Sequence, residues 1–235
     1  MLFSSYPIVI HNMMKPLQLF IVALFALTSC SNNQCNNQAL TGEDDSANIF
    51  LKTFQDITVD TLHVFSQFGT NQDAKFQGKE IDKSFYHYFA FDENLTFNLK
   101  ENNVPKEHIY SCYKFKLSDS KTGLLIRIPS QYDVTAIDLF VWDNSTKRIE
   151  SKETLSDGFG DEGWYFVQDA WITDLNRDGK LDILKRKKDH DEDLDDSTKV
   201  KNTDSIFVFL ANENRFMKSS LQIDKSKFQL EHWKE

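Results

Sequence analysis

The sequence predicts a mainly β domain, built as an antiparallel meander with minor helix. Three observations lead to this fold class. The chain of 235 residues holds 20 phenylalanines, and its aromatic and branched residues gather in short alternating runs, which are typical of half-buried strands. Clusters of Asn, Asp, Ser and Gly separate the runs, and these residues favour turns. Beyond residue 29 only two prolines occur, Pro105 and Pro129.

The strands are expected, in order, at 61–66, 109–117, 122–128, 135–142, 147–154, 164–172, 181–185, 205–210 and 215–221. The run 122–128 is apolar enough for a strand buried on both faces, and 205–210 is the clearest strand. Within 109–117 the alternation places four residues on one face, namely Ile109, Tyr113, Phe115 and Leu117.

Turns and helices complete the expected order. Residues 143–146 read Asp-Asn-Ser-Thr, and such side chains bond to their own backbone in turns. Gly158, Gly160 and Gly163 indicate a long loop. Short helices are expected at 46–54 and 83–91.

The first 29 residues predict a secretory signal. They carry one charge, Lys15, and an apolar run from Leu17 to Leu27. This run is too short to span a membrane, which takes about 20 apolar residues. Met13 or Met14 is an alternative start of the signal, and a short buried helix is the alternative to a signal altogether.

The signal ends in Leu27-Thr28-Ser29-Cys30, which resembles the lipobox of bacterial lipoproteins. The resemblance implies that residues 1–29 are removed and that Cys30 becomes the lipid-bearing first residue of the mature protein. Ser31 is not acidic, and this is similar to lipoproteins sorted to the outer membrane, here expected to face the periplasm. Residues 30–42 are polar and predict a flexible tether, which leaves 43–235 as a single β-rich domain.

The charge of the chain restricts its partners. The whole sequence has a formal charge of −9, from 27 basic and 36 acidic residues. Without Lys15 the mature part has 26 basic residues, hence 26 − 36 = −10. Such a charge disfavours nucleic acid and anionic membrane surfaces as partners, and it suits cations or basic proteins.

Two cysteines remain beside Cys30, and two outcomes stay open for them. In an oxidising compartment Cys35 and Cys112 pair and tie the tether to the domain. Alternatively, both are free thiols.

The segment 174–182 has the spacing of a calcium-binding loop. Asp174, Asn176, Asp178 and Asp182 place side-chain oxygens at positions 1, 3, 5 and 9, and Lys180 at position 7 offers its carbonyl. Gly179 at position 6 permits the sharp turn. The sequence therefore predicts calcium as the cofactor, and the alternative is a metal-free Asp-Gly turn.

The surroundings of the loop differ from an EF-hand. Position 12 is Lys185 instead of a bidentate glutamate, and the flanks predict strands instead of helices. Dockerin modules share the start of the loop but occur as paired repeats with an acidic position 12.

The loop and its flanks resemble the blade loop of FG-GAP or VCBS-type repeats. Trp171-Ile172-Thr173 precedes the loop, Ile183-Leu184 follows it, and 207–212 with Phe216 is similar to the closing strand pair. The resemblance covers one copy, 164–216, with 189–203 as an insertion. It implies a β-propeller-like or related β scaffold.

The layout is also similar to that of periplasmic lipoproteins that inhibit lysozyme-like enzymes, including immunity proteins against peptidoglycan hydrolases. Such proteins combine a lipobox, a β-propeller-like body and one calcium loop. No inhibitory motif matches residue by residue, so no inhibitory residue is assigned.

The remaining motifs carry no predicted chemistry. The acidic run 189–196 favours a solvated loop over a second cation site or a contact for a basic partner. The histidines show no metal-ligand spacing, and no catalytic motif is present.

The sequence therefore predicts a non-catalytic, lipid-anchored and calcium-stabilised binding domain of the cell envelope. Its partner is expected to be a protein, such as a hydrolase, or a glycan. The alternatives are an inhibitor or immunity protein against a peptidoglycan hydrolase and, third, an enzyme acting on glycans.

Overall fold

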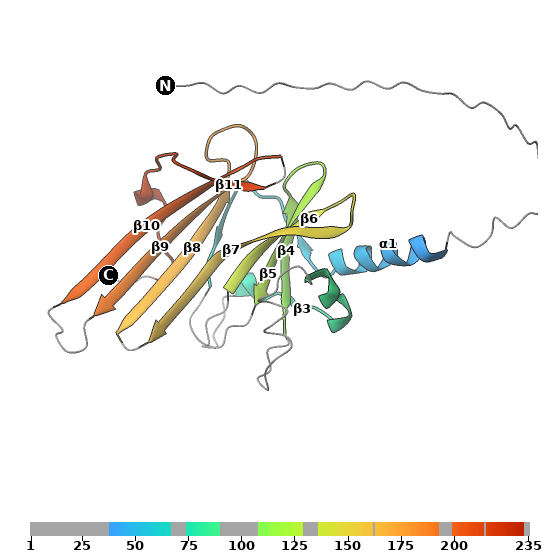
Figure 1. Ribbon diagram of the computed structural model, residues 1–235, viewed down its shortest axis with the longest axis horizontal. Coiled ribbons are helices and arrows are strands. Elements are labelled where there is room, and N and C mark those ends of the chain that lie inside the picture. The colour runs from blue at the N-terminus through green and yellow to red at the C-terminus, as the bar shows by residue number, and fades with distance from the viewer. Residues whose placement is uncertain are drawn as a thin grey trace, which may run out of the picture. The chain divides into compact units, whose positions relative to one another are not determined.

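A single sheet of eleven strands forms most of the domain (Figure 1). The computed structural model describes residues 38–66, 74–89, 108–128, 136–161, 163–192, 199–213 and 215–232. The strands are β1 (Gln55–Asp56), β2 (Thr61–Val64), β3 (Lys79–Glu80), β4 (Tyr110–Lys116), β5 (Lys121–Ile128), β6 (Ala136–Asp143), β7 (Arg148–Asp161), β8 (Trp164–Thr173), β9 (Asp182–Glu192), β10 (Val200–Ala211) and β11 (Phe216–Ser219). The helices are α1 (Gln38–Leu51) and the 3-10 helices η1 (Ala74–Phe76), η2 (Lys83–Phe89) and η3 (Lys225–Lys227).

The strands β4 to β11 lie in chain order and pair antiparallel, which confirms the predicted meander. Among the described strands only β1 pairs in parallel, with β4, so the sheet is mixed. Over the described residues the sheet does not close, and it shows no propeller.

The strand β7 divides the sheet into two halves. Its first part, up to Ser156, pairs with β6, and its second part, from Asp157, pairs with β8. The first half therefore contains β1 and β3 to β6, and the second contains β8 to β11, with β2 paired to the end of β8.

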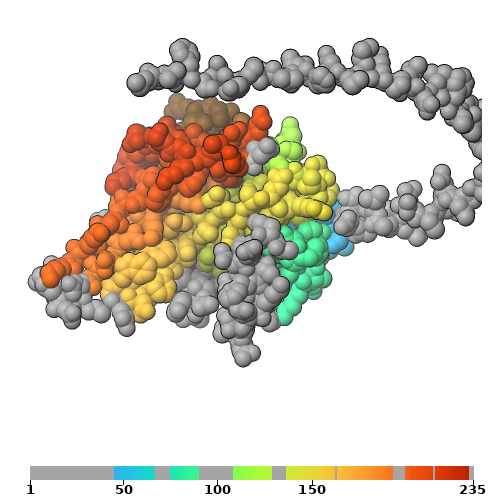
Figure 2. Space-filling view, in the orientation of Figure 1, coloured from blue at the N-terminus to red at the C-terminus, as the bar shows by residue number. Residues whose placement is uncertain are grey.

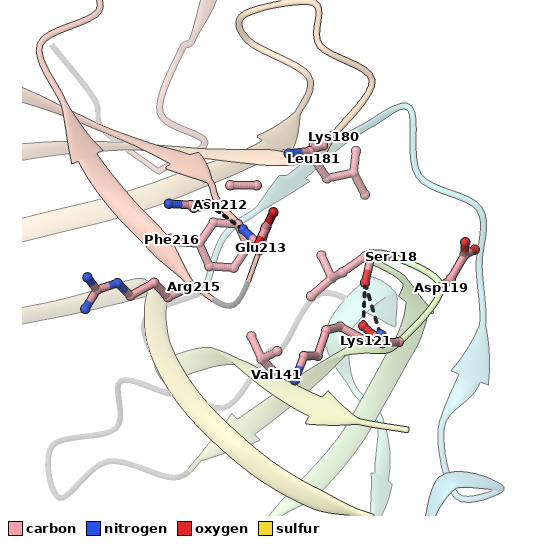
Figure 3. Close-up of a pocket in the computed structure, with 13 residues that line it drawn as sticks. Ser118, Asp119, Lys121, Val141, Lys180, Leu181, Asn212, Glu213, Arg215 and Phe216 are labelled. Atoms are coloured by element: carbon pink, nitrogen blue, oxygen red, sulfur yellow. Dashed lines mark hydrogen bonds between the residues drawn. The ribbon is translucent and has the colours of Figure 1, made fainter. Parts of the chain in front are cut away.

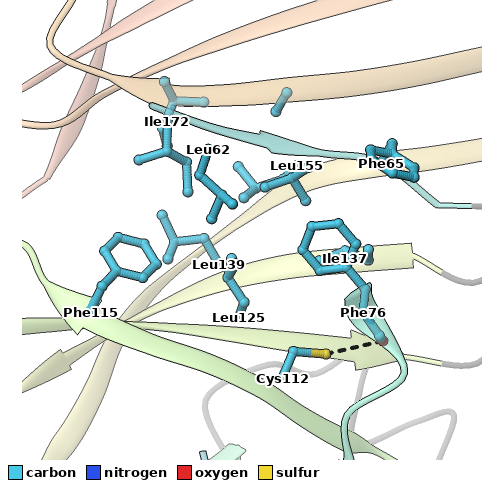
Figure 4. Packing of buried hydrophobic residues seen from close by; sticks show 13 residues of the cluster. Leu62, Phe65, Phe76, Cys112, Phe115, Leu125, Ile137, Leu139, Leu155 and Ile172 are labelled. Carbon is cyan, nitrogen blue, oxygen red and sulfur yellow. Dashed lines mark hydrogen bonds between the residues drawn. The ribbon is translucent and has the colours of Figure 1, made fainter. Parts of the chain in front are cut away.

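The main hydrophobic core lies between these two halves (Figure 4). Phe115 of β4 and Leu139 of β6 come from the first half, and Ile172 of β8 and Ile183 of β9 from the second. Alternate residues of each strand reach this core because successive side chains point to opposite faces.

Two further clusters cover the outer faces. On the first half, Phe50 of α1 packs against Trp142 of β6, and both are fully buried. On the second half, Phe228 from the C-terminal segment packs on Trp171 of β8, with ring centroids 5.2 Å apart. The strands β5 and β6 are thus buried on both faces, which explains their almost continuous apolar runs.

The structure corrects three predictions about individual strands. Gly158 and Gly160 lie inside β7, not in a long loop, because they pair with β8. The acidic residues of 189–192 also extend β9, where Asp189 accepts a hydrogen bond from Thr203 Oγ1 (2.9 Å). The remainder of the acidic run, 193–196, lies outside the described residues.

The third correction concerns the face of β4. Ile109 packs in the outer cluster with α1, whereas Phe115 packs in the core between the halves. A register shift between Ser111 and Lys114 inserts one extra residue, and this reverses the faces of the residues that follow. The predicted common face is therefore wrong for Ile109.

The helices also differ from the expected ranges. Residues 83–89 form a 3-10 helix, and α1 ends at Leu51. It begins at Gln38, within the segment expected as tether. Among the described residues no helix is long and apolar enough to cross a membrane.

Candidate calcium loop and adjacent cleft

The predicted calcium loop connects the end of β8 at Thr173 to the start of β9 at Asp182. Two residues in it have positive φ, Arg177 at 65° and Gly179 at 84°. A Cβ on Gly179 would meet nothing within 4 Å. Glycine is therefore favoured there by the backbone conformation and not by lack of space.

The Asp174 side chain caps the backbone of this loop. Its Oδ1 accepts hydrogen bonds from the N–H groups of Arg177 (2.7 Å) and Asp178 (3.1 Å). Its Oδ2 accepts from the N–H of Gly179 (2.9 Å). The first position of the predicted motif thus holds the loop in its curled conformation.

Asn176 and Asp178 continue the same pattern. Asn176 Oδ1 accepts from the Asp178 N–H (3.0 Å), and Asn176 Nδ2 donates to Asp178 Oδ2 (3.1 Å). Asp178 Oδ1 accepts from the Lys180 N–H (2.9 Å). The bonds from Lys180 and Asn176 lower the pKa of the Asp178 carboxyl, because they stabilise its charged form.

Asp182, the ninth position, is buried and links the loop to another strand. Its Oδ2 accepts from the Leu175 N–H (3.0 Å), and its Oδ1 accepts from the Ala211 N–H (2.8 Å) at the end of β10. Burial raises the pKa of this carboxyl, and the backbone N–H groups of Ala211, Leu175 and Asn176 oppose that rise. The sequence motif gave no sign of the contact with Ala211.

The donor chemistry of the loop fits a hard cation. The side-chain atoms that the predicted motif would offer to a metal ion are all oxygens, as calcium prefers. A carboxylate offers about four acceptor positions, and the bonds above use only two each on Asp178 and Asp182. The structure brings Asp174, Asn176 and Asp178 together, and Asp182 joins them through the backbone of Leu175 and Asn176.

The side-chain positions satisfy backbone N–H groups and do not form a ready cage. Within the described ranges, no three His, Cys, Asp or Glu side chains are placed to share one metal ion. Calcium binding would therefore need the carboxylates to reorient. Cys30, the predicted lipid site, lies outside the described residues.

A cleft of about 450 Å³ adjoins the loop (Figure 3). Three connections that lie at the same end of the sheet form its walls (Figure 1): the end of loop 174–182, the β4–β5 turn and the β10–β11 turn. Figure 2 shows this end at the top of the coloured domain. The cleft lining is Leu117, Ser118, Asp119, Ser120, Lys121, Val141, Lys180, Leu181, Ala211, Asn212, Glu213, Arg215 and Phe216.

The interior of the cleft is largely apolar and its margin is charged. Leu181 and Phe216 lie on one side, and Val141 lies across from them (Figure 3). Glu213 and Arg215 come from the turn at the margin. An apolar interior with a few polar groups at the edge is typical of a binding site.

An ionic cluster of the buried Lys121 and Asp143 with the more exposed Glu150 supports one wall of the cleft. The Lys121 ammonium bonds to the carboxylates of Asp143 and Glu150. Burial alone would lower the pKa of Lys121, but the two carboxylates outweigh it and raise that pKa. Hydrogen bonds from Lys121, Ser145 and Thr146 hold the pKa of Asp143 far below its ordinary value. The two carboxylates neutralise the positive charge of Lys121, which therefore offers the cleft little charge.

The sequence also did not predict a polar contact between β2 and β8. His63 Nε2 of β2 lies 2.9 Å from Oδ2 of the fully buried Asp169 of β8. The His63 ring stacks on Trp171, with centroids 4.3 Å apart. The two residues stand 106 positions apart, so no local spacing could reveal the pair.

Cys112 bears on the open question of a disulfide. Its thiol is free and buried, and it lies 3.3 Å from the Phe76 carbonyl oxygen. Burial raises the pKa of this thiol to about 12. Cys35 lies outside the described residues, so their pairing stays a prediction.

Comparison with known proteins identifies no relative of this chain: no family, no curated protein and no solved structure matches it.

Proposed function

We propose that this chain is a lipid-anchored binding domain of the bacterial cell envelope, stabilised by calcium and without catalytic activity. The observation that supports the proposal most strongly is that the loop and the cleft share residues. Lys180 and Leu181 belong both to the predicted calcium loop and to the lining of the cleft.

The loop supplies the residues that would hold the cation. Asp174, Asn176, Asp178 and Asp182 would contribute side-chain oxygens and Lys180 its backbone carbonyl. A bound calcium ion would supply positive charge that offsets the repulsion between the carboxylates. The carboxylates themselves already orient the backbone N–H groups of the loop.

The cleft is the proposed ligand site. Its interior offers Leu181, Phe216 and Val141 for apolar contact, and its margin offers the hydroxyl of Ser118 and the charges of Glu213 and Arg215. This mixture suits a protein segment or a glycan. A formal charge of −9 makes nucleic acid an unfavourable ligand.

The placement in the envelope rests on the N-terminal sequence. The run ending in Leu27-Thr28-Ser29-Cys30 resembles a lipobox, and acyl chains on Cys30 would anchor the domain stably. An outer-membrane lipoprotein facing the periplasm is the proposed form.

Thermal unfolding of the full-length chain in calcium and in chelator tests the proposal. At a calcium concentration of about 100 times Kd, binding adds about 2.7 kcal/mol to the free energy of unfolding. Asp178→Ala should lose most of this calcium-dependent gain. Asp224→Ala is the matched control, since Asp224 also accepts a backbone hydrogen bond, from Ser226, but outside the loop. An identical Tm with and without calcium in the wild type would refute the proposed cofactor.

A second candidate function is inhibition of a peptidoglycan hydrolase. The formal charge of −9 favours it, because that charge is complementary to a basic enzyme. The expected result is a stoichiometric loss of muramidase activity when the protein is added to a basic lysozyme. Full activity at a tenfold excess of this protein, across several lysozyme types, would exclude the candidate.

A further inference from the structure

The strand β10 has an uncovered edge along most of its length. It spans Val200–Ala211, but β11 pairs with it only from Val208 to Ala211. Among the described residues no further strand or loop backbone bonds to this side of 200–207. Figure 1 shows this part of β10 at the left edge of the sheet. The free backbone groups of such an edge can pair with another strand.

The even-numbered residues of β10 present these free backbone groups. The Asn212 N–H donates to the Arg215 carbonyl (2.9 Å), so the backbone groups of Asn212 point toward β11. Residues of an antiparallel strand alternate in the side to which their N–H and C=O groups point, and β10 pairs on both sides without a register shift. The residues whose N–H and C=O groups point away from β9 are therefore Val200, Asn202, Asp204 and Ile206.

The C-terminal segment contacts this part of β10 through side chains. Lys225 Nζ lies 2.9 Å from Asp204 Oδ2, and Ile223 and Ile206 belong to the same cluster on the outer face. These contacts do not use the outward backbone groups of β10. The start of the strand is also exposed, since 44% of the surface of Val200 is accessible to solvent.

A second copy of this chain fits the edge in one antiparallel register. A two-fold axis perpendicular to the sheet pairs residues of the same face, because both copies use the same strand. With the axis at Thr203, Val200 lies opposite Ile206 of the second copy, and Asn202 lies opposite Asp204. Moving the axis by one residue places Asp204 opposite Asp204, or Val200 opposite Asp204. Like charges directly opposite each other are destabilising, and the apolar contact is lost in both cases.

We propose that the edge 200–207 of β10 is a self-association surface, on which β10 of a second copy pairs antiparallel and joins two sheets into one. The outward backbone groups would form about eight hydrogen bonds between the copies. The edge holds one basic and one acidic side chain, Lys201 and Asp204, so the negative charge of the chain is not concentrated there. The inference goes beyond the proposed function and depends on neither calcium nor the cleft.

Disulfide formation between cysteines placed on β10 tests the proposal in the full-length chain. Thr203 would face its own copy across a pair without hydrogen bonds, with the two Cα atoms about 4.5 Å apart. This separation suits a disulfide. Thr203→Cys should therefore give a covalent dimer under a mild oxidant, and mass spectrometry should locate the link at residue 203 of both copies.

Lys201→Cys is the matched control. Residue 201 is exposed like residue 203 and lies on the same face of β10. In the proposed register, however, the two copies of residue 201 would stand four residues apart along the strands, or about 14 Å. Lys201→Cys should therefore give no covalent dimer under the same conditions.

The variant Asn202→Pro removes one outward N–H without removing a hydrogen bond to β9. Proline is tolerated on an edge strand where the N–H faces solvent. In the Thr203→Cys background, Asn202→Pro should abolish the covalent dimer. Asn202→Ala also loses the side-chain bond to His190 (2.9 Å) but keeps the backbone N–H, so the covalent dimer should persist in this second control.

The comparison of residues 203 and 201 decides the proposal even if Asn202→Pro does not fold. Equal cross-linking at both positions would show random collision and would overturn it. So would the absence of a dimer from a Thr203→Cys chain that keeps the wild-type Tm. A Thr203→Cys chain that links to other proteins but not to itself would overturn the second copy as the occupant of this edge.

Discussion

At the scale of single residues, Arg186 shows how a buried charge can hold several parts of the domain. Its guanidinium forms a two-bond contact with Asp204, through Nε to Oδ1 (3.0 Å) and Nη2 to Oδ2 (2.9 Å). It also donates to the carbonyl of Phe228 (2.6 Å). Arg186 thereby joins β9, β10 and the C-terminal segment, because one planar group offers several donors.

This contact predicts a pH-dependent contribution to stability. The hydrogen bonds from Arg186, opposed by partial burial and aided by Lys225, lower the pKa of Asp204 to about 2. A carboxyl with a lowered folded-state pKa stabilises the fold above its unfolded pKa, near 4, and loses that contribution as the pH falls toward 2. With the 24% exposure of its side chain, the expected contribution is about 1–2 kcal/mol.

Urea unfolding of wild type and Asp204→Asn from pH 7 downwards checks this prediction. The difference in free energy of unfolding should be constant down to about pH 5 and shrink below it. Asp119→Asn is the control, since the Lys116–Asp119 pair is exposed to solvent and should contribute nothing measurable. A difference between wild type and Asp204→Asn that grows as the pH falls would contradict the assignment.

At the scale of elements, the pairing of β4 with β5 depends on a close approach at Gly123. The Phe115 ring lies over this residue, and a Cβ on Gly123 would come 2.8 Å from its Cζ atom and 3.1 Å from Leu139 Cδ1. Phe115 is buried in the core between the two halves. Glycine is therefore required here by packing, although it weakens an ordinary strand.

Gly123→Ala should lower the free energy of unfolding by about 1–2 kcal/mol, because overpacking outweighs the reduced entropy of the unfolded chain. Phe115→Leu shortens the side chain that the new methyl group meets. The cost of Phe115→Leu should therefore be smaller in the Gly123→Ala background than in the wild type. Urea unfolding of all four proteins measures this coupling, and simple additivity of the two costs would contradict the packing argument.

At the scale of the whole domain, β7 pairs with both halves of the sheet, and we expect the two halves to unfold as one cooperative unit. Leu155 is fully buried in the core where β7 leaves β6 and reaches β8. The register of β7 on β6 shifts at this point, between Ile137 and Asp138. Such a bulge bends a strand and increases its twist, which lets β7 belong to both halves.

Leu155→Ala should cost about 2–5 kcal/mol, the range for removing a buried leucine side chain. Both halves should lose the same stability, because they share this core. Trp142 and Trp171 lie on the outer faces of the two halves. When each is replaced by fluorotryptophan, the 19F signals of the folded state should disappear with the same urea midpoint. Two separate midpoints would show that the halves unfold independently. Leu221→Ala, at an exposed position, should leave the midpoint unchanged.

The sequence by itself determined what depends on neighbouring residues. Alternating apolar residues placed the strands because a strand with a buried face needs them at every second position. The turn at 143–146 also follows from local bonds: Asp143 Oδ1 accepts from the N–H groups of Ser145 (2.8 Å) and Thr146 (2.7 Å). The hydrogen-bonded curl of 174–180 has the same local origin.

Only the tertiary structure decided the contacts between residues far apart in the chain. Asp182 accepts a hydrogen bond from Ala211, and His63 bonds to Asp169. The cleft is lined by three connections that are far apart in the chain. A residue pattern also cannot reveal the register shift that turns Ile109 away from Phe115, or the partner strand that keeps Gly158 extended. Such contacts depend on which strands become neighbours, and that is fixed by burial of the whole sheet instead of by local preference.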